Sequence, residues 1–281
     1  MRHQDFIARQ KSLSLDGLSY LSLKVAYTDV GEGDPVILLH GIPTWSYLYH
    51  EVIPLLTPHG RVLAPDFLGH GYSDRRDRFD RSLPAQARMI LRFMDELGLQ
   101  NATIVGHDTG GGVALIMGIE HPDRVKRLVL SNVVAYDSWP IDDMIALGNP
   151  NWRSKPPKEV AEFVAGGLPD GLHNRAALTD EFRAGIVAPY SDEEGKISLI
   201  RNASALNTNH TMALVDRHKD IAAPTLVLWG VRDPWQTIAD GERLAREIPD
   251  ARLVRLENAS HWLQQDAPAE FAREIAAFLG R

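Results

Sequence analysis

The chain has 281 residues, of which 44% are hydrophobic, and it carries a formal net charge of −7. No run of lysine and arginine is longer than two residues, so nucleic acids and anionic membranes are not expected as partners. The sequence contains no cysteine, which excludes disulfide bonds and thiolate metal sites, and we expect neither a cofactor nor a metal.

The length and the N-terminal residues indicate a single domain without a targeting signal. The chain is long enough to bury one large core. Residues 1–11 are polar and mixed in charge, without the apolar segment of a secretory signal, and no apolar run approaches the length of a membrane span. We therefore expect a cytoplasmic protein, either a monomer or a homodimer.

Strand-like and helix-like segments alternate in the first half of the chain. Residues 21–27 alternate between apolar and polar side chains, which is typical of an edge strand. Residues 85–97 repeat apolar side chains at helical spacing. Four short, continuously apolar segments have the character of strands that are buried on both faces of a parallel sheet; they are residues 36–39, 61–64, 102–105 and 128–130.

This pattern breaks after Ala135. From residue 137 to residue 215 strand signals are few, prolines and glycines are frequent, and helical fragments such as 159–164 occur. The alternation then restarts with a strand at 224–230, a helix at 238–248, a strand at 253–256 and a helix at 269–279. We predict an α/β fold with a mostly parallel central sheet and helices on both faces. Its core is formed by residues 1–136 and 216–281, and residues 137–215 form a helical cap.

The most informative motif, Gly106-His107-Asp108-Thr109-Gly110-Gly111, follows the strand at 102–105 and precedes helix-like residues 113–117. A strand, a glycine-flanked turn and a helix are the setting of a nucleophile elbow, in which one reactive side chain projects from a tight turn. The usual residue there is serine, in the pattern G-x-S-x-G, but this chain has Asp108. An aspartate predicts attack on an electrophilic saturated carbon to give an alkyl-enzyme ester, whereas a serine would predict acyl transfer.

Two later residues complete a candidate catalytic triad. Asp233 and His261 follow the last two predicted strands, and ligands bind beyond the carboxyl ends of the strands in a parallel sheet. The order Asp108, Asp233, His261 matches nucleophile, acid and base. We expect His261, polarised by Asp233, to remove a proton from the water that hydrolyses the ester. Asp137 is the alternative acid, but the strand before it ends in residues 131–132 without a carboxylate.

Several of these residues also have a structural interpretation. Asp108 is of a type that favours tight turns. The glycines at 110–112 could cradle a phosphate, but the chain has neither G-x-G-x-x-G nor G-K-[ST] there, so nucleotide binding is not expected. We expect His40 to pack behind the turn that follows its strand, and Asp66 and Asp74 to fix loops.

Two longer segments carry a resemblance to a known family. Residues 40–49 read His-Gly-Ile-Pro-Thr-Trp-Ser-Tyr-Leu-Tyr, and residues 64–74 read Ala-Pro-Asp-Phe-Leu-Gly-His-Gly-Tyr-Ser-Asp. With the elbow, they resemble the α/β-hydrolase superfamily and, within it, the aspartate-nucleophile branch of haloalkane dehalogenases and epoxide hydrolases. The resemblance spans the chain except the cap. It implies a small organic substrate that reacts with water.

Two positions depart from the dehalogenase pattern. That family usually carries Trp directly after the nucleophile, where this chain has Thr109, and Asn or Glu where it has Ile42. The Trp, with an Asn or a second Trp, donates N–H bonds to the leaving halide in the family. The backbone N–H groups of Ile42 and Thr109 are still the natural pair for an oxyanion hole, because ester hydrolysis develops negative charge on Asp108.

The cap is expected to supply the other side chains around the substrate. Trp152 or Trp139 could donate an indole N–H to a halide, although large aromatic side chains more often bury area. Opening of an epoxide needs an acid, normally two cap tyrosines, and the cap contains Tyr190 with Tyr136 at its start. Trp152 and Tyr190 are therefore the substrate-binding candidates of the cap.

These patterns predict a hydrolase with an alkyl-enzyme ester intermediate that cleaves carbon–halogen bonds in a small organic substrate. The alternatives are an epoxide hydrolase, or an ester or lactone hydrolase of the same fold without dehalogenase activity. A catalytically silent small-molecule receptor is disfavoured, because the chain keeps both Asp108 and His261.

Overall fold

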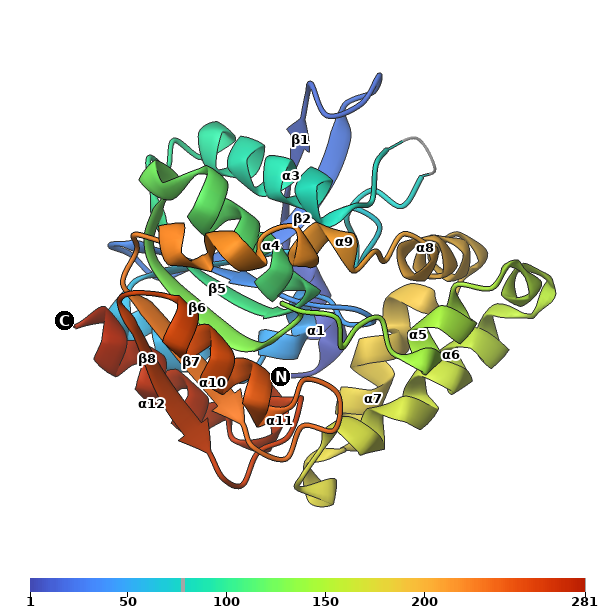
Figure 1. Ribbon diagram of the computed structural model, residues 1–281. Helices are drawn as coiled ribbons and strands as arrows, with labels where there is room; N and C mark the ends of the chain where they lie inside the picture. Colours follow the sequence, from blue (N-terminus) through green and yellow to red (C-terminus); the bar gives the residue numbers. More distant parts are fainter. Residues whose placement is uncertain (77–78, 281) are drawn as a thin grey trace.

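An eight-stranded sheet forms the centre of the computed structural model, which describes residues 1–76 and 79–280 (Figure 1). The strands lie in the order β1-β2-β4-β3-β5-β6-β7-β8. Their bounds are β1 (Lys11–Leu15), β2 (Leu23–Val30), β3 (Pro35–Leu39), β4 (Arg61–Pro65), β5 (Ala102–Asp108), β6 (Val125–Val133), β7 (Thr225–Gly230) and β8 (Ala251–Leu256).

The sheet is mostly parallel, as predicted. Strands β4, β3, β5, β6, β7 and β8 pair in parallel, and β2 is antiparallel to both β1 and β4. Strands β5 and β7 are buried along their whole length, because both faces are covered. The expectation that residues 21–27 form an edge strand was wrong. Strand β2 lies inside the sheet, and the edge is formed by β1, which has only five residues, of which three are exposed.

Helices cover both faces of the sheet and build two apolar clusters. Successive residues of β3 belong to different clusters, Ile37 to one and Val36 to the other, because neighbouring side chains of a strand point to opposite faces. The first cluster receives side chains from α3 (Leu83–Glu96), α4 (Thr109–Glu120) and α10 (Ile238–Glu247). The second receives them from α1 (His3–Arg9), α2 (Ile53–Leu56), α11 (Leu263–Asp266) and α12 (Pro268–Leu279).

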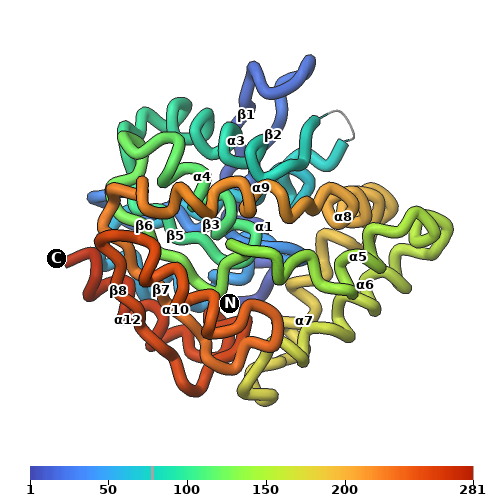
Figure 2. The backbone as a smooth tube through the Cα atoms, in the orientation of Figure 1, coloured from blue at the N-terminus to red at the C-terminus, as the bar shows by residue number. Residues whose placement is uncertain are grey.

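A group of helices joins β6 to β7 and lies beside the sheet, where the chain is coloured green to yellow (Figures 1 and 2). It contains α5 (Asp142–Leu147), α6 (Pro157–Gly167), α7 (Asp180–Val187) and α8 (Glu193–Ser204). Helix α6 packs against α7 and α8, and α5 packs against α8. The next helix, α9 (Asn209–Met212), lies within residues 137–215 but packs against α4 of the core. The cap of residues 137–215 remains a proposal. Within residues 1–76 and 79–280, no helix is both long and apolar enough to cross a membrane.

Candidate active site

The turn between β5 and α4 presents Asp108. Asp108 ends β5 and adopts a left-handed backbone conformation with φ of 51°, which costs a non-glycine residue about 1–3 kcal/mol and persists only where the surroundings enforce it. The neighbouring glycines permit this turn. A Cβ on Gly106 would lie 2.6 Å from the carbonyl oxygen of Gly110, and one on Gly110 would overlap the backbone carbonyl of His40. The turn therefore has the geometry that the motif predicts.

Two backbone N–H groups hold the carboxylate of Asp108. The N–H of Ile42 donates to Oδ1 at 2.8 Å, and the N–H of Thr109 acts on the same carboxylate and lowers its pKa. Gly41 makes this approach possible, because a Cβ at that position would overlap Oδ1 of Asp108. The structure thus brings together the two donors that the sequence predicts for an oxyanion hole.

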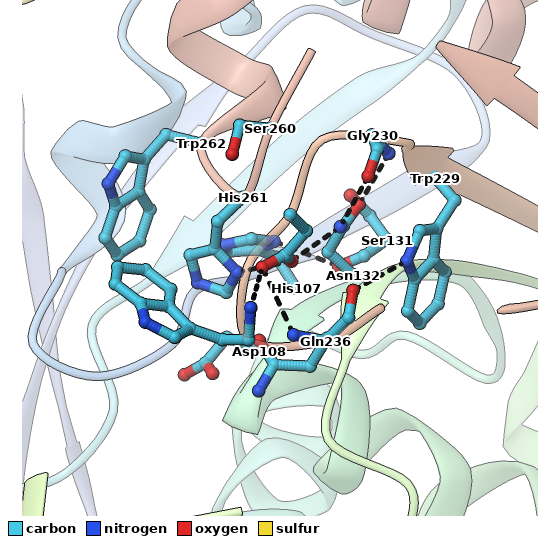
Figure 3. A network of polar contacts seen from close by, with 12 residues as sticks. His107, Asp108, Ser131, Asn132, Trp229, Gly230, Gln236, Ser260, His261 and Trp262 are labelled. Atoms are coloured by element: carbon cyan, nitrogen blue, oxygen red, sulfur yellow. Dashed lines mark hydrogen bonds and ion pairs between the residues drawn. The ribbon is translucent and has the colours of Figure 1, made fainter. Parts of the chain in front are cut away.

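His261 is paired with Asp233. Nδ1 of His261 lies 2.9 Å from Oδ2 of Asp233, and both side chains are buried. Asp233 accepts three further bonds, from the backbone N–H of Trp235 and of Gln236 at 2.8 and 3.1 Å and from the side-chain amide of Asn132 at 2.6 Å. In Figure 3 the ring of His261 points toward Asp108. The alternative acid, Asp137, is exposed and does not take this place.

Burial and neighbouring charges shift the pKa values of this site. Burial lowers the pKa of His261, but the charge and hydrogen bond of Asp233 together with the charge of Asp108 raise it above 6.5. Burial raises the pKa of the Asp108 carboxyl, against the opposing effects of His261 and of the Thr109 and Ile42 N–H groups. The site thus combines the His261 imidazole, whose pKa is raised, with the Asp108 carboxylate, whose ionised form the N–H groups of Ile42 and Thr109 stabilise.

Three aromatic rings enclose His261. The centroids of His107, Trp235 and Trp262 lie 4.6, 4.9 and 4.3 Å from the centroid of the His261 ring. His107 stays neutral, because burial lowers its pKa well below the usual value, and its Nδ1–H donates to the carbonyl of Ser131 at 2.9 Å. These contacts restrict the plane of the imidazole and leave both His261 and Asp233 buried.

A cavity of about 350 Å³ opens over Asp108 and His261. Core residues such as Ile42, Thr109 and Val134 form its floor, and residues of the proposed cap form its walls, with Trp139, Met144, Phe163 and Leu168 among them. Three carboxylates of the cap segment also line it: Asp143, Glu162 and Asp170. Within the described residues, no lysine or arginine lines this cavity. The three carboxylates are exposed, and two of them face basic side chains: Glu162 lies 3.7 Å from Lys158 and Asp170 lies 3.9 Å from Arg175. The lining is therefore mostly apolar, with exposed polar groups at its edge.

Comparison with known proteins shows the family of the chain. A model of the alpha/beta hydrolase fold matches residues 34–268. The chain belongs to the α/β-hydrolase family. This α/β-hydrolase is 32% identical over 271 residues to "Haloalkane dehalogenase 2" of Mycobacterium tuberculosis, with 92% of both chains covered. It is 28% identical over 285 residues to the cis-3-alkyl-4-alkyloxetan-2-one decarboxylase of Xanthomonas campestris, with 92% of this chain and 93% of that protein covered.

A solved structure has the same fold over nearly the whole chain. An alpha/beta hydrolase fold protein from Burkholderia ambifaria superimposes with a TM-score of 0.85 at 25% identity, and 97% of this chain and 100% of that chain are covered. With the relatives above, this places the α/β-hydrolase in the dehalogenase-like branch of the superfamily, as the resemblance implied.

The two cap tryptophans predicted as halide donors already donate their indole N–H groups to other residues of the protein. Trp152 does not line the cavity of this α/β-hydrolase; its indole N–H donates to the carbonyl of Ala146 at 2.9 Å, and its ring packs behind Phe163. Trp139 lines the cavity, but its N–H donates to the hydroxyl of Thr211 at 2.9 Å. The expectation that Trp152 contacts the substrate is therefore corrected, since its donor is satisfied within the cap.

The predicted tyrosines are also absent from the cavity lining. Tyr190 is fully buried, its hydroxyl lies 3.4 Å from the carbonyl of Thr44, and burial raises its pKa. Tyr136 donates its hydroxyl to Glu247 at 2.8 Å. Tyr190 is thus neither placed nor poised to protonate a substrate, and its prediction as a substrate-binding residue is corrected.

The α/β-hydrolase keeps the structural roles expected for its other polar residues. His40 lies against the Gly41 carbonyl through Nδ1, and its Nε2 accepts the backbone N–H of Phe67 at 3.0 Å. Asp66 accepts the backbone N–H of Ser46 at 3.0 Å, and Asp74 pairs with a neighbouring arginine. These contacts hold the loops after β3 and β4 in place.

Sequence reasoning missed the residues directly after Asp233. Trp235 and Gln236 line the same cavity as Asp108, and Asn132 donates to Asp233 from the end of β6. The available signal was the segment Asp233-Pro234-Trp235-Gln236, which sets two large polar-tipped side chains next to a candidate catalytic residue.

Proposed function

We propose that this α/β-hydrolase cleaves carbon–halogen bonds in neutral small organic substrates through an ester on Asp108. One observation carries the proposal. The carboxylate of Asp108 is held by the N–H groups of Ile42 and Thr109 in the same cavity as the base His261. A serine in this turn would acylate, whereas a carboxylate can displace a halide from a saturated carbon.

The first step is a displacement at carbon. An oxygen of Asp108 forms a bond to the substrate carbon, the carbon–halogen bond breaks, and the halide leaves with the bonding electron pair. No proton moves in this step, so no base is needed. Oδ1 is already held by the Ile42 N–H, which leaves Oδ2 as the attacking oxygen.

The second step hydrolyses the ester. His261 removes a proton from water through Nε2, and the water oxygen bonds to the carbonyl carbon of Asp108. The N–H groups of Ile42 and Thr109 stabilise the oxyanion. Collapse of this intermediate breaks the ester bond, and His261 gives its proton to the departing alkoxide, which leaves as the alcohol. The carboxylic acid formed on Asp108 then releases the second proton of the water, and its carboxylate is restored. The products are an alcohol, a halide ion and one proton from the water consumed.

The charge of the cavity supports neutral substrates. Asp143, Glu162 and Asp170 line it, and lysine and arginine are missing from the described lining. Burial of a haloacid carboxylate needs a cationic partner, and no lysine or arginine lines the described part of the cavity, so its binding costs free energy. Haloalkanes therefore fit better than haloacids, in agreement with the name of the Mycobacterium tuberculosis relative.

Two other substrate classes are weaker candidates. Epoxide opening needs an acid, and no tyrosine lines the cavity within the described residues. A strained lactone is a second candidate, since Ile42 and Thr109 lack halide-binding side chains and the Xanthomonas campestris relative is named for an oxetan-2-one. The substrate panel below separates these classes by their products.

Trapping of the ester tests the proposal. His261→Gln should form the ester and fail to hydrolyse it, because only the second step needs a base. We would incubate this variant with a panel of bromoalkanes, epoxides and β-lactones, and map any mass increase to the peptide that contains Asp108. Asp108→Asn is the matched control and should stay unmodified. Halide release without any adduct in the His261→Gln variant would contradict the mechanism.

A further inference from the structure

A departing halide needs donors that are free to bind it. The two positions that supply such donors in the resembling dehalogenases carry Ile42 and Thr109 here, and their backbone N–H groups are bonded to Asp108. Trp152, the cap candidate, donates to Ala146. Donors for the leaving group must therefore come from elsewhere in the lining of the cavity.

Only one of the cavity's indole groups is free in the described part of the chain. Trp139, Trp235 and Trp262 line the cavity. The N–H of Trp139 donates to Thr211 at 2.9 Å, and that of Trp262 donates to the carbonyl of Leu168 at 3.1 Å. The N–H of Trp235 has no acceptor among residues 1–76 and 79–280, and the side chain is half-buried at the cavity.

Gln236, the next residue, adds an amide without a partner. Its side chain is 3% exposed and lines the cavity, and its Oε1 has no hydrogen-bond partner among the described residues. Its backbone N–H and carbonyl are bonded to Asp233 and Trp229. An amide can turn its NH₂ and its oxygen about one bond, so the unbonded group is free to present N–H to a ligand. A buried amide without partners is costly, and a ligand in the cavity relieves that cost.

The loop that carries both residues is held rigidly next to the reacting groups. Oδ1 of Asp233 accepts the backbone N–H of Trp235 at 2.8 Å and that of Gln236 at 3.1 Å. The Trp235 ring stands edge-on to His261, with centroids 4.9 Å apart. Gln236 and Asp108 both line the same cavity.

We propose that the indole N–H of Trp235 and the side-chain amide of Gln236 bind the leaving halide. This inference rests on the proposed function. The halide departs with the electron pair of the broken bond and accepts both N–H groups, so no proton is transferred. The catalytic acid Asp233 thus has two tasks: its side chain orients His261, and its Oδ1 fixes the loop that carries the halide donors.

Removal of the indole N–H tests the inference. Trp235→Phe and Gln236→Met keep most of the side-chain volume and delete the donors. We expect each to slow halide release from a bromoalkane by about tenfold to hundredfold, the effect of losing an N–H bond to a charged group. Each should also weaken the binding of bromide ion alone, followed by the line width of the bromide NMR signal. Trp152→Phe, outside the cavity, is the matched control and should leave both quantities unchanged.

The outcomes separate this inference from the proposed function. Wild-type rates and bromide affinity in both folded variants would overturn the halide site and leave Asp108 chemistry standing. If the wild-type protein releases no halide from any bromoalkane, the proposed function fails, and bromide binding then decides the site on its own. Loss of bromide binding in Trp235→Phe supports the site; retained binding, or none in the wild type, overturns it. Should Trp235→Phe fail to fold by circular dichroism, Gln236→Met decides.

Discussion

The side-chain amide of Asn132 donates to Oδ2 of Asp233 at 2.6 Å, and this is the same oxygen that faces Nδ1 of His261 at 2.9 Å. Oδ1 of Asn132 in turn accepts the backbone N–H of Gly230 at 2.8 Å. One amide at the end of β6 therefore joins the end of β7 to the carboxylate that is paired with His261. In the proposed mechanism, this uncharged residue positions the acid that follows the next strand.

Asn132→Ala should weaken this arrangement in two measurable ways. It removes an N–H bond to a buried charged group, which lowers the free energy of unfolding by about 1.5–3 kcal/mol. It also frees Asp233 to rotate away from His261, so ester hydrolysis should slow more than ester formation. Chemical denaturation and rapid-quench measurement of the two steps check these effects. Asn209→Ala, at an exposed position of α9, is the control and should change neither quantity.

Asp233→Asn should make hydrolysis of the ester rate-limiting. The charge and hydrogen bond of Asp233 raise the pKa of His261, so their loss lowers that pKa and makes the imidazole a weaker base. An amide can also stabilise the wrong tautomer, and the comparable change in a serine protease triad costs about 10⁴-fold. The ester on Asp108 should accumulate, as seen by intact-protein mass spectrometry. Unchanged turnover in this variant would argue that the acid lies elsewhere, with Asp137→Asn as the comparison.

The fold was predictable because its signals are local and strong. The short apolar strands 102–105 and 128–130 and the helix at 85–97 are present as β5, β6 and α3. The topology then determines where the site residues lie, because parallel strands end at the same edge of a sheet. Asp233 and His261 therefore meet although they are far apart in the sequence, and their catalytic roles remain predictions.

The cap could not be predicted at the level of single donors. Trp152 bonds to the carbonyl of Ala146, only six residues before it, and this depends on how two short helical segments pack. Periodicity carries no information on that packing. Trp235 is a different case, because it belongs to the loop after Asp233 and not to the cap, and the sequence does not show which indole N–H lacks an acceptor. The edge strand β1 was missed because its residues are mostly exposed.

The pH dependence of the two chemical steps should differ. His261 must be neutral to take a proton from water, and its pKa is raised above 6.5, so hydrolysis should rise with pH through that raised value and then level off. Ester formation needs an ionised Asp108 and no base, so its rate should not change as His261 titrates. In rapid-quench experiments at pH values below the pKa of His261, the ester should therefore accumulate. A hydrolysis rate that falls with rising pH over this range would contradict the role of His261 as the base.

Gly41→Ala should abolish most activity without unfolding the protein. A Cβ at this position would overlap Oδ1 and Cβ of Asp108, so the turn must shift and the Ile42 N–H must leave the carboxylate. Loss of one oxyanion donor costs about 10²–10³-fold. Gly118→Ala in α4 is the matched control: its Cβ would lie 3.5 Å from the nearest side-chain atom, an ordinary contact, and alanine favours a helix. Activity assays with circular dichroism distinguish the two variants.

Oxygen labelling decides between an aspartate nucleophile and an aspartate base. In the proposed mechanism water attacks the carbonyl carbon of Asp108, so one oxygen of the carboxylate comes from water after each turnover and the product receives an oxygen from Asp108. A single turnover in heavy-oxygen water, with enzyme in excess, should therefore label Asp108 and leave the alcohol unlabelled. Peptide mass spectrometry should find the label in the peptide that contains Asp108, and the same experiment with Asp108→Asn should find none. If the alcohol of the first turnover is labelled and Asp108 is not, water attacks the substrate directly, and Asp108 acts as a general base.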